Sequence, residues 1–405
     1  MPSAGARMTN QAIAEPLPGT IPGAAAGQHV SFGFLPMGAA QAIGCAGLLM
    51  LGVQPVILDA LRAAGRLTIP QMTLAATIEM LALGIVSGIM GAAVAHRHLR
   101  LYAIGGCAVL AAANLGCLVA DGLGFVLLRG VAGAAGGVLI WVTVGLVTRS
   151  TAAVRLSAVF LGAQSVTQAI VAALIPFIEP SFGANAGALA LAVTAAACVL
   201  LIPAIPDTLP DFPPPASDRG SLNLPGAIAL LGTFLLLGGI VGFWVFAEGL
   251  GAMDNVAPSL VSFAIAASLV AQVGGAVFVA VLGDRLPAGL SIVLVALGYL
   301  VIIATVAWVP ADTPFLIATL GFGFLWTIGL PLFVPLMIEA DPSRRAALLL
   351  PGAQLLGGSI GPQITGFFAT DTDLQPVIVA SSGMFLGTIL CTVLVMALQR
   401  RRRAV

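Results

Sequence analysis

The sequence predicts an all-α membrane protein, with twelve transmembrane helices in two repeated halves of six helices each. Three observations predict this fold class. The 405 residues are 59% hydrophobic and only 8% charged, with a mean hydropathy of +1.09, whereas soluble domains carry about 25% charged residues. Apolar stretches of membrane-spanning length recur along the chain, and short matches between its two parts recur at a nearly constant offset.

The apolar stretches define the expected helices. A helix needs about 20 predominantly apolar residues to cross the hydrocarbon core, and backbone groups in lipid must be satisfied within their own segment, which favours helix. The stretches lie at 37–61, 71–94, 101–120, 123–147, 156–177 and 186–205, and then at 226–250, 258–282, 289–309, 315–338, 346–369 and 376–398.

The other segments are expected to lie outside the membrane. Residues 206–225 read PDTLPDFPPPASDRGSLNLP, and proline cannot continue a helix, so this segment is predicted to be a cytoplasmic linker. Residues 1–35 lack the apolar core and cleavage site of a signal peptide. They are rich in proline, glycine, alanine and glutamine, so they are predicted to be a disordered cytoplasmic tail. Residues 399–405 form a basic cytoplasmic tail, which leaves 36–205 and 226–398 as the two six-helix halves.

The placement of arginine predicts the orientation. All sixteen basic residues are arginine, and sixteen acidic residues balance them. With both termini in the cytoplasm, twelve arginines lie in inner loops or the C-terminal tail, against only Arg62 and Arg66 outside. The positive-inside rule therefore predicts a multi-pass inner-membrane protein with cytoplasmic termini. The balanced charge provides no global field for nucleic acid, so no nucleic-acid partner is expected.

The two halves match at corresponding positions. Asp59 lies opposite Glu248 at an offset of 189, and the Gly-Ala-Gln triplet at 162–164 lies opposite the same triplet at 352–354 at an offset of 190. The second span of each half adds a match of Ala-Ala-Thr with Ala-Ala-Ser at an offset of 191. Paired halves of this kind are typical of transporters that rock around a site at the interface between the halves.

Local motifs resemble those of the major facilitator superfamily. The stretch RGVAGAAGG at 129–137 is similar to the arginine-plus-glycine motif that this family carries on its fourth helix. The loop GAAVAHRHLR at 91–100 keeps Arg97 but has His96 where the family's loop pattern has aspartate, and the matching loop of the second half keeps Asp284 and Arg285. The resemblance implies a secondary transporter with gating loops at Arg97, Asp284 and Arg285.

The resemblance also has an implication for the direction of transport. The Gly-Pro pair that family antiporters carry on the fifth helix is missing from 156–177, which favours proton-coupled uptake over proton-driven efflux of a drug-like or metabolite substrate. Family proton symporters often pair the fourth-helix arginine with an acid in the first helix. Here Gln54 occupies approximately that place, so the coupling acid is expected to be Glu79 or Asp59.

Four ionisable residues fall within the expected spans, namely Asp59, Glu79, Arg129 and Glu248. A charge at bilayer depth costs about 2.5–3.5 kcal/mol on insertion scales. Glu79 and Arg129 both lie roughly 10–13 Å below the outer surface, so the sequence predicts that they pair. Desolvation raises the proton affinity of a carboxylate and a nearby arginine lowers it, which suits a coupling site. The alternatives are a structural ion pair for Glu79 and Arg129, and interfacial positions for Asp59 and Glu248.

Uncharged side chains complete the candidate substrate cavity. Gln164 and Gln168 lie on one helix face at spacing i, i+4, and amides can donate to and accept from an oxygenated organic solute. Packing between helices is the alternative for each amide, and packing or an interfacial belt for each tryptophan. The expected substrate-binding residues are Gln54, Gln164, Gln168, Trp244, Glu248, Trp326 and Gln354.

The sequence does not predict an enzyme. Its three histidines lie in the tail and one loop, its five cysteines show no metal-ligand spacing, and without lysine it has no nucleotide phosphate loop. No metal or cofactor is expected. A membrane sensor or scaffold is the alternative from another class, although such proteins usually carry a soluble domain. The expected partners are a small organic solute, protons and the lipid bilayer, and the chain is expected to act as a monomer.

Overall fold

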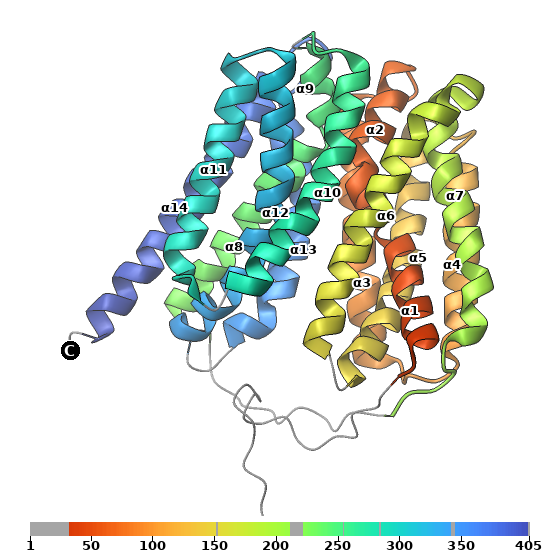
Figure 1. The fold of residues 1–405 in the computed structure, drawn as a ribbon, viewed down its shortest axis with the longest axis horizontal. Coiled ribbons are helices and arrows are strands. Elements are labelled where there is room, and N and C mark those ends of the chain that lie inside the picture. The colour runs from red at the N-terminus through yellow and green to blue at the C-terminus, as the bar shows by residue number, and fades with distance from the viewer. Residues whose placement is uncertain are drawn as a thin grey trace, which may run out of the picture.

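The computed structural model describes residues 32–150, 153–210, 222–253, 255–282, 285–341 and 345–403. In these ranges the chain folds into long helices that lie side by side (Figure 1), with isolated bridges as the only β-type pairing. The expected N-terminal tail up to residue 31, the linker residues 211–221 and Asp284 lie outside the described residues.

The helices of the first part of the chain, in order, are α1 (Phe34–Gly47), α2 (Leu49–Ala63), α3 (Ile69–Ala93), α4 (Leu99–Gly116), α5 (Gly122–Arg149), α6 (Ala153–Phe182), η1 (Gly183–Asn185), α7 (Ala186–Cys198) and η2 (Val199–Ala204). Those of the second part are α8 (Leu224–Trp244), α9 (Ala247–Met253), α10 (Pro258–Leu282), α11 (Ala288–Trp308), α12 (Asp312–Ala340), α13 (Arg345–Gly366) and α14 (Gln375–Arg403).

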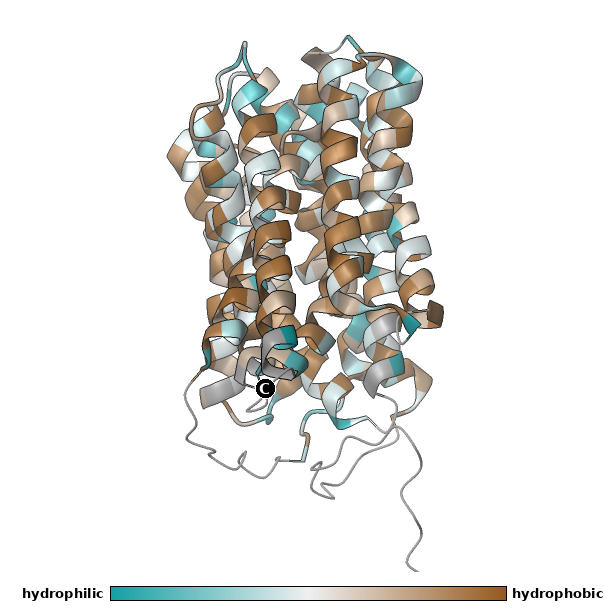
Figure 2. Ribbon diagram, turned by 90° about the vertical axis from the view of Figure 1, so that its left-hand side faces the viewer, coloured by the Kyte–Doolittle hydropathy of each residue, from teal (hydrophilic) through white to brown (hydrophobic). Residues whose placement is uncertain are grey.

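These helices make the protein a multi-pass membrane protein. Ten stretches of the described chain are long and apolar enough to cross a membrane. One of them, Arg155–Ala204, contains both α6 and α7, and α13 adds a further long helix packed against α8, so the described helices follow the twelve expected spans. Apolar residues cover much of the bundle's length, and hydrophilic residues gather toward its ends (Figure 2).

The first span of each half is broken, where the sequence predicted one continuous helix. At Leu48, between α1 and α2, the backbone carbonyl accepts hydrogen bonds from the Gln168 side chain (2.9 Å) and from the Leu51 N–H (3.2 Å). A side chain that bonds to a helix carbonyl in this way interrupts the regular ladder. The second break lies between α8 and α9, where the Phe246 N–H bonds to the Phe243 carbonyl in a tighter turn.

Contacts between the halves follow the repeat. Helix α3 packs against α13, and α6 packs against α10. By the offsets in the sequence, α3 corresponds to α10 and α6 to α13, so these two contacts are equivalent. The bundle has two ends, which we call the α9 end, where α2 ends and α9 lies, and the linker end, where η2 ends and α8 begins (Figure 1). At the α9 end, α2 contacts α9 across the halves.

Glycines set the closest helix approaches within each half. A Cβ on Gly133 of α5 would collide with the backbone of Glu79 on α3, and a Cβ on Gly323 of α12 would collide with the backbone of Ser268 on α10. The two pairs are related by offsets of 190 and 189, so the same close approach recurs in both halves. Small residues allow such backbone contact between membrane helices.

Candidate transport site

Arg129 and Glu79 form a buried ion pair in the first half. Arg129 Nε donates to Glu79 Oε2 at 2.9 Å, and Arg129 Nη2 donates to Glu79 Oε1. The remaining Nη1 donates to Asn114 Oδ1 on α4 at 2.6 Å. Only 2% of the Arg129 side chain and 8% of the Glu79 side chain are exposed. The two-point geometry is that of a strong, orientation-specific arginine–carboxylate pair, and it joins α3, α4 and α5 at one place.

The second half carries no charge at the equivalent positions. Arg129 corresponds to Thr319 at the offset of 190, and Glu79 corresponds to Ser268 at the offset of 189. Thr319 and Ser268 each donate a hydroxyl hydrogen bond to a carbonyl of their own helix. The packing of α3 against α5 is therefore repeated in the second half, whereas the ion pair belongs to the first half alone.

The interface between the halves is polar at mid-depth. Trp244 Nε1 on α8 donates to the Gly52 carbonyl on α2 at 3.3 Å. The Ser165 hydroxyl on α6 donates to Gln272 Oε1 on α10 at 3.1 Å. Both bonds connect one half to the other, next to the break where Gln168 binds the Leu48 carbonyl.

Trp244 and Trp326 belong to an aromatic cluster. Trp244 stacks on Phe322 with ring centroids 5.7 Å apart, and it meets Trp326 edge-on at 5.8 Å. A small cavity beside the cluster is lined by Trp244, Phe315, Thr319 and Phe322 among others, and Trp326 does not line it. Of the two tryptophans, Trp244 is placed both at a cavity and at the interface between the halves.

The predicted glutamines fall into two groups. Gln168 is bound to Leu48, and Gln354 Nε2 donates to Thr233 Oγ1 of its own half at 3.4 Å. In contrast, both amide atoms of Gln54 and Oε1 of Gln164 are buried and have no hydrogen-bond partner among the residues the structure describes. Gln54 is only 1% exposed. A buried polar atom without a partner costs free energy, so these atoms have capacity for a polar ligand.

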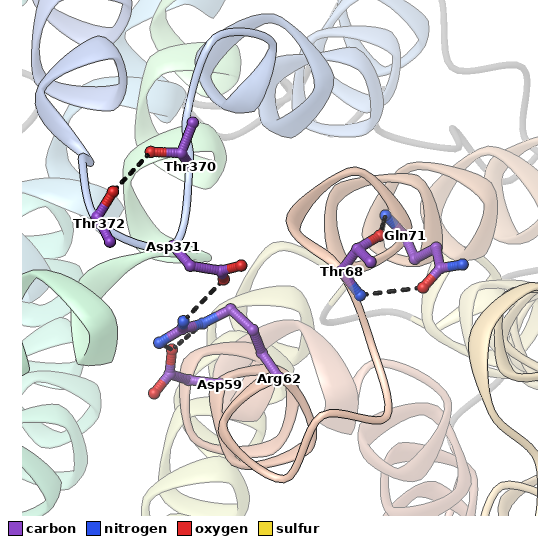
Figure 3. A network of polar contacts seen from close by, with 7 residues as sticks. All are labelled: Asp59, Arg62, Thr68, Gln71, Thr370, Asp371 and Thr372. Atoms are coloured by element: carbon purple, nitrogen blue, oxygen red, sulfur yellow. Dashed lines mark hydrogen bonds and ion pairs between the residues drawn. The ribbon is translucent and has the colours of Figure 1, made fainter.

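Asp59 lies in an ion-pair network at the α9 end rather than at a free interfacial position. Arg62 binds Asp59 Oδ1 through Nε (2.9 Å) and Nη2 (2.8 Å), and its Nη1 binds Asp371 Oδ1 at 3.1 Å (Figure 3). Asp371 lies between α13 and α14, so Arg62 connects the two halves. Arg62 and Asp371 were not among the site residues predicted from the sequence. The i, i+3 spacing of Asp59 and Arg62 was a usable signal, but nothing local marks Asp371.

Glu248 lies on α9 beside a second cavity between the halves. The cavity is bounded by α2, α6, η1 and α7 of the first half and by α9 and α10 of the second. The Glu248 residue is half-buried, and its Oε2 is buried without a hydrogen-bond partner in the described part of the chain. Its sequence counterpart Asp59 has an arginine partner, so the two matched acids have different environments.

The gating-loop residues are only partly described. Arg97 is exposed and takes part in a backbone bridge to Thr208, and Arg285 is exposed. In this loop, the side chain that packs against the helices is that of His96. Its ring packs on Trp141 with centroids 4.8 Å apart, and its carbonyl accepts from the Leu209 N–H. The gating roles of Arg97, Asp284 and Arg285 stay predictions.

Comparisons with known proteins support the fold through structure rather than sequence. No family profile and no curated protein matches the sequence. A bacterial homologue of the human lysosomal transporter Spinster, in an inward-facing and occupied conformation, has a TM-score of 0.62 at 13% identity, covering 91% of this chain and 96% of that one. The nucleoside transporter NupG has a TM-score of 0.69 at 11% identity, with coverages of 90% and 99%. A proton-dependent oligopeptide transporter has a TM-score of 0.69 at 10% identity, with coverages of 91% and 99%.

The chain therefore has the major facilitator fold, as the sequence motifs predicted. The structural neighbours are transporters, and the similarity extends over nine-tenths of this chain. At these low identities the likeness identifies the fold, and the substrates named for the neighbours belong to those proteins.

Proposed function

We propose that this protein is a secondary transporter of the inner membrane that moves a small organic solute by alternating access, with proton-coupled uptake as its mode. The observation that carries the proposal is the interface between the halves. The halves meet through polar contacts at mid-depth and at the α9 end. Gln54 and Gln164 lie close in the sequence to two of the contacting residues, and their buried amide atoms have no hydrogen-bond partner in the described part of the chain.

The broken first span of each half supports a site at mid-depth. Interrupted helices near the membrane midplane are typical of transporter binding sites, because the interruption presents backbone groups to a solute. The Leu48 and Gly52 carbonyls, which accept from Gln168 and Trp244, lie at or just after the break between α1 and α2. We assign Gln54, Gln164, Gln168 and Trp244 to solute binding.

The Glu79–Arg129 pair is our candidate for proton coupling. Both of its side chains are buried, and the equivalent positions of the second half, Thr319 and Ser268, carry no charge. A carboxylate held by a buried arginine becomes able to accept a proton when helix movement separates the two groups. Asn114, bound to the same guanidinium, would hold the arginine in place during that step.

The test of the proposal is transport by purified protein in sealed proteoliposomes. An inward proton gradient should drive accumulation of the true substrate above its outside concentration, and an uncoupler should abolish it. Transport that follows the solute gradient alone would make the protein a facilitator and contradict the coupling. Movement of solute against the proton flow would establish efflux instead of uptake.

A further inference from the structure

The cavity beside Glu248 combines acidic groups with apolar walls. Ile57 of α2 and Ile175 of α6 supply apolar surface, and Gly187 of α7 supplies no side chain. Glu179, Glu248 and Ser262 are its charged or hydroxyl side chains. Because its walls come from both halves, the cavity changes shape whenever the halves move relative to each other.

The charge at this cavity is unbalanced. Glu248 has a buried carboxylate oxygen with no hydrogen-bond partner among the described residues, and the Glu179 carboxylate lines the same cavity. No cationic residue lines the cavity within the described chain. The arginine of the neighbouring network, Arg62, is occupied by Asp59 and Asp371. Burying a carboxylate without a counter-charge is costly, so the site is complementary to a positive charge that none of the described residues around the cavity provides.

The approach of α9 to α2 brings this acid to the interface. A Cβ on Gly249 would lie 3.2 Å from Asp59 Oδ1, so the glycine next to Glu248 allows the α9 backbone to pack directly on Asp59. The two positions that match in the repeat, Asp59 and Glu248, therefore lie on facing helices at the α9 end. One is neutralised by Arg62 and the other is not.

We propose that this cavity binds the positively charged group of the transported solute, so that the substrate is an organic cation with an ammonium or guanidinium group and an apolar body. The inference rests on the proposed transport function and adds the substrate class. Glu248 binds the cationic group as the solute enters or leaves at the α9 end, Glu179 adds long-range attraction, and Ile57 and Ile175 contact the apolar body. Separation of the halves at this end widens the cavity to admit the solute.

The test uses a reporter cysteine at the cavity. All five native cysteines are buried, so Ser262→Cys provides a labelling site on the cavity wall with little background. The rate of maleimide labelling is measured in proteoliposomes with butylammonium, 1-butanol or butyrate, which share a four-carbon chain and differ in charge. We expect butylammonium to slow labelling at least threefold and the other two to leave it unchanged.

Variants of the cavity residues identify the side chain that binds butylammonium and so slows labelling. In the Ser262→Cys background, Glu248→Gln should abolish the protection and Glu248→Asp should retain part of it. Asp312→Asn, which changes an acid at the same end outside the cavity, should retain all of it. Equal protection by 1-butanol, or full protection in a Glu248→Gln protein that elutes as a single folded species, would overturn the proposal.

Transport assays distinguish failure of the cation site from failure of the proposed transport function. Counterflow of labelled butylammonium in the same proteoliposomes should depend on Glu248. Selective protection without any solute movement would leave the cation site standing and contradict the transport function. Transport of neutral or anionic solutes only, with no protection by butylammonium, would leave the transport function standing and overturn the cation site.

Discussion

At the scale of single residues, the main feature is that buried charges are paired in one place and unpaired in another. Arg129 has two hydrogen bonds to Glu79 and one to Asn114, whereas Glu248 has a buried oxygen that no described residue binds. A paired charge in an apolar bundle stabilises structure or moves a proton. An unpaired carboxylate at a cavity is suited to a ligand of opposite charge.

The first prediction concerns the ion pair. Arg129→Ala leaves the Glu79 carboxylate buried and uncompensated, which costs about 3–5 kcal/mol of folding free energy. We therefore expect low expression and a clearly lower melting temperature in detergent. Combining Glu79→Gln with Arg129→Gln removes both charges and should recover much of the stability without restoring proton-driven accumulation.

The single Glu79→Gln variant tests the coupling role separately. It should lose proton-driven accumulation yet retain exchange of pre-loaded substrate, because exchange requires no proton release. Both activities are measured in the same proteoliposomes. Normal accumulation by Glu79→Gln would show that the pair is structural. Proton coupling would then depend on Asp59 or on no acidic residue of the first half.

At the scale of helices, glycine determines how closely α3 and α5 pack, and so where the ion pair forms. We predict that Gly133→Ala destabilises the protein by about 1–3 kcal/mol, the usual cost of overpacking, because its Cβ would collide with the Glu79 backbone. The matched control is Gly105→Ala on α4, where no heavy atom lies within 4 Å of the added Cβ. Thermal unfolding in detergent compares the two, and equal melting temperatures would contradict the argument.

A further prediction concerns the ion pair that the loop between α13 and α14 makes with Arg62. Asp371→Asn removes the cross-half ion pair with Arg62 while leaving Asp59 paired. Because the Asp371 side chain is 69% exposed, the pair is worth at most about 1 kcal/mol. The α9 end should therefore open more often, with labelling of Ser262→Cys rising by no more than about fivefold. Asp373→Asn in the same loop is the control, since Asp373 bonds only locally to Thr370 and Gln375.

At the scale of the whole molecule, the orientation in the membrane is the property to test. Twelve arginines on one side predict that the linker end faces the cytoplasm. Cysteines introduced in the 206–225 linker should react with an impermeant maleimide only after the cell is opened. A cysteine at Ala252, an exposed residue of α9, should react in intact cells. Reaction of both sites from the same side would refute the topology.

Hydropathy and sequence offsets are properties of the chain, so the lipid environment, the number of spans and the repeat could all be predicted without the structure. Segment length limits how a helix crosses lipid, so equal depth on neighbouring spans was enough to predict that Arg129 and Glu79 meet. The C-terminal ends of α6 and α14 lie at Phe182 and Arg403, each five residues beyond the predicted span. In α14 the additional residues are glutamine and arginine, which are good helix formers.

Which polar groups have hydrogen-bond partners could not be predicted, because it depends on how helices distant in the sequence meet. The breaks in the first span of each half depend on contacts such as Gln168 with Leu48, 120 residues away in the sequence. Asp371 binds Arg62 across 309 residues. The rotation of each helix determines that Gln354 pairs with Thr233 and that Gln54 has no partner among the residues the structure describes. A hydrogen bond requires two groups within about 3 Å of each other, and residue spacing along the chain cannot supply that distance between distant helices.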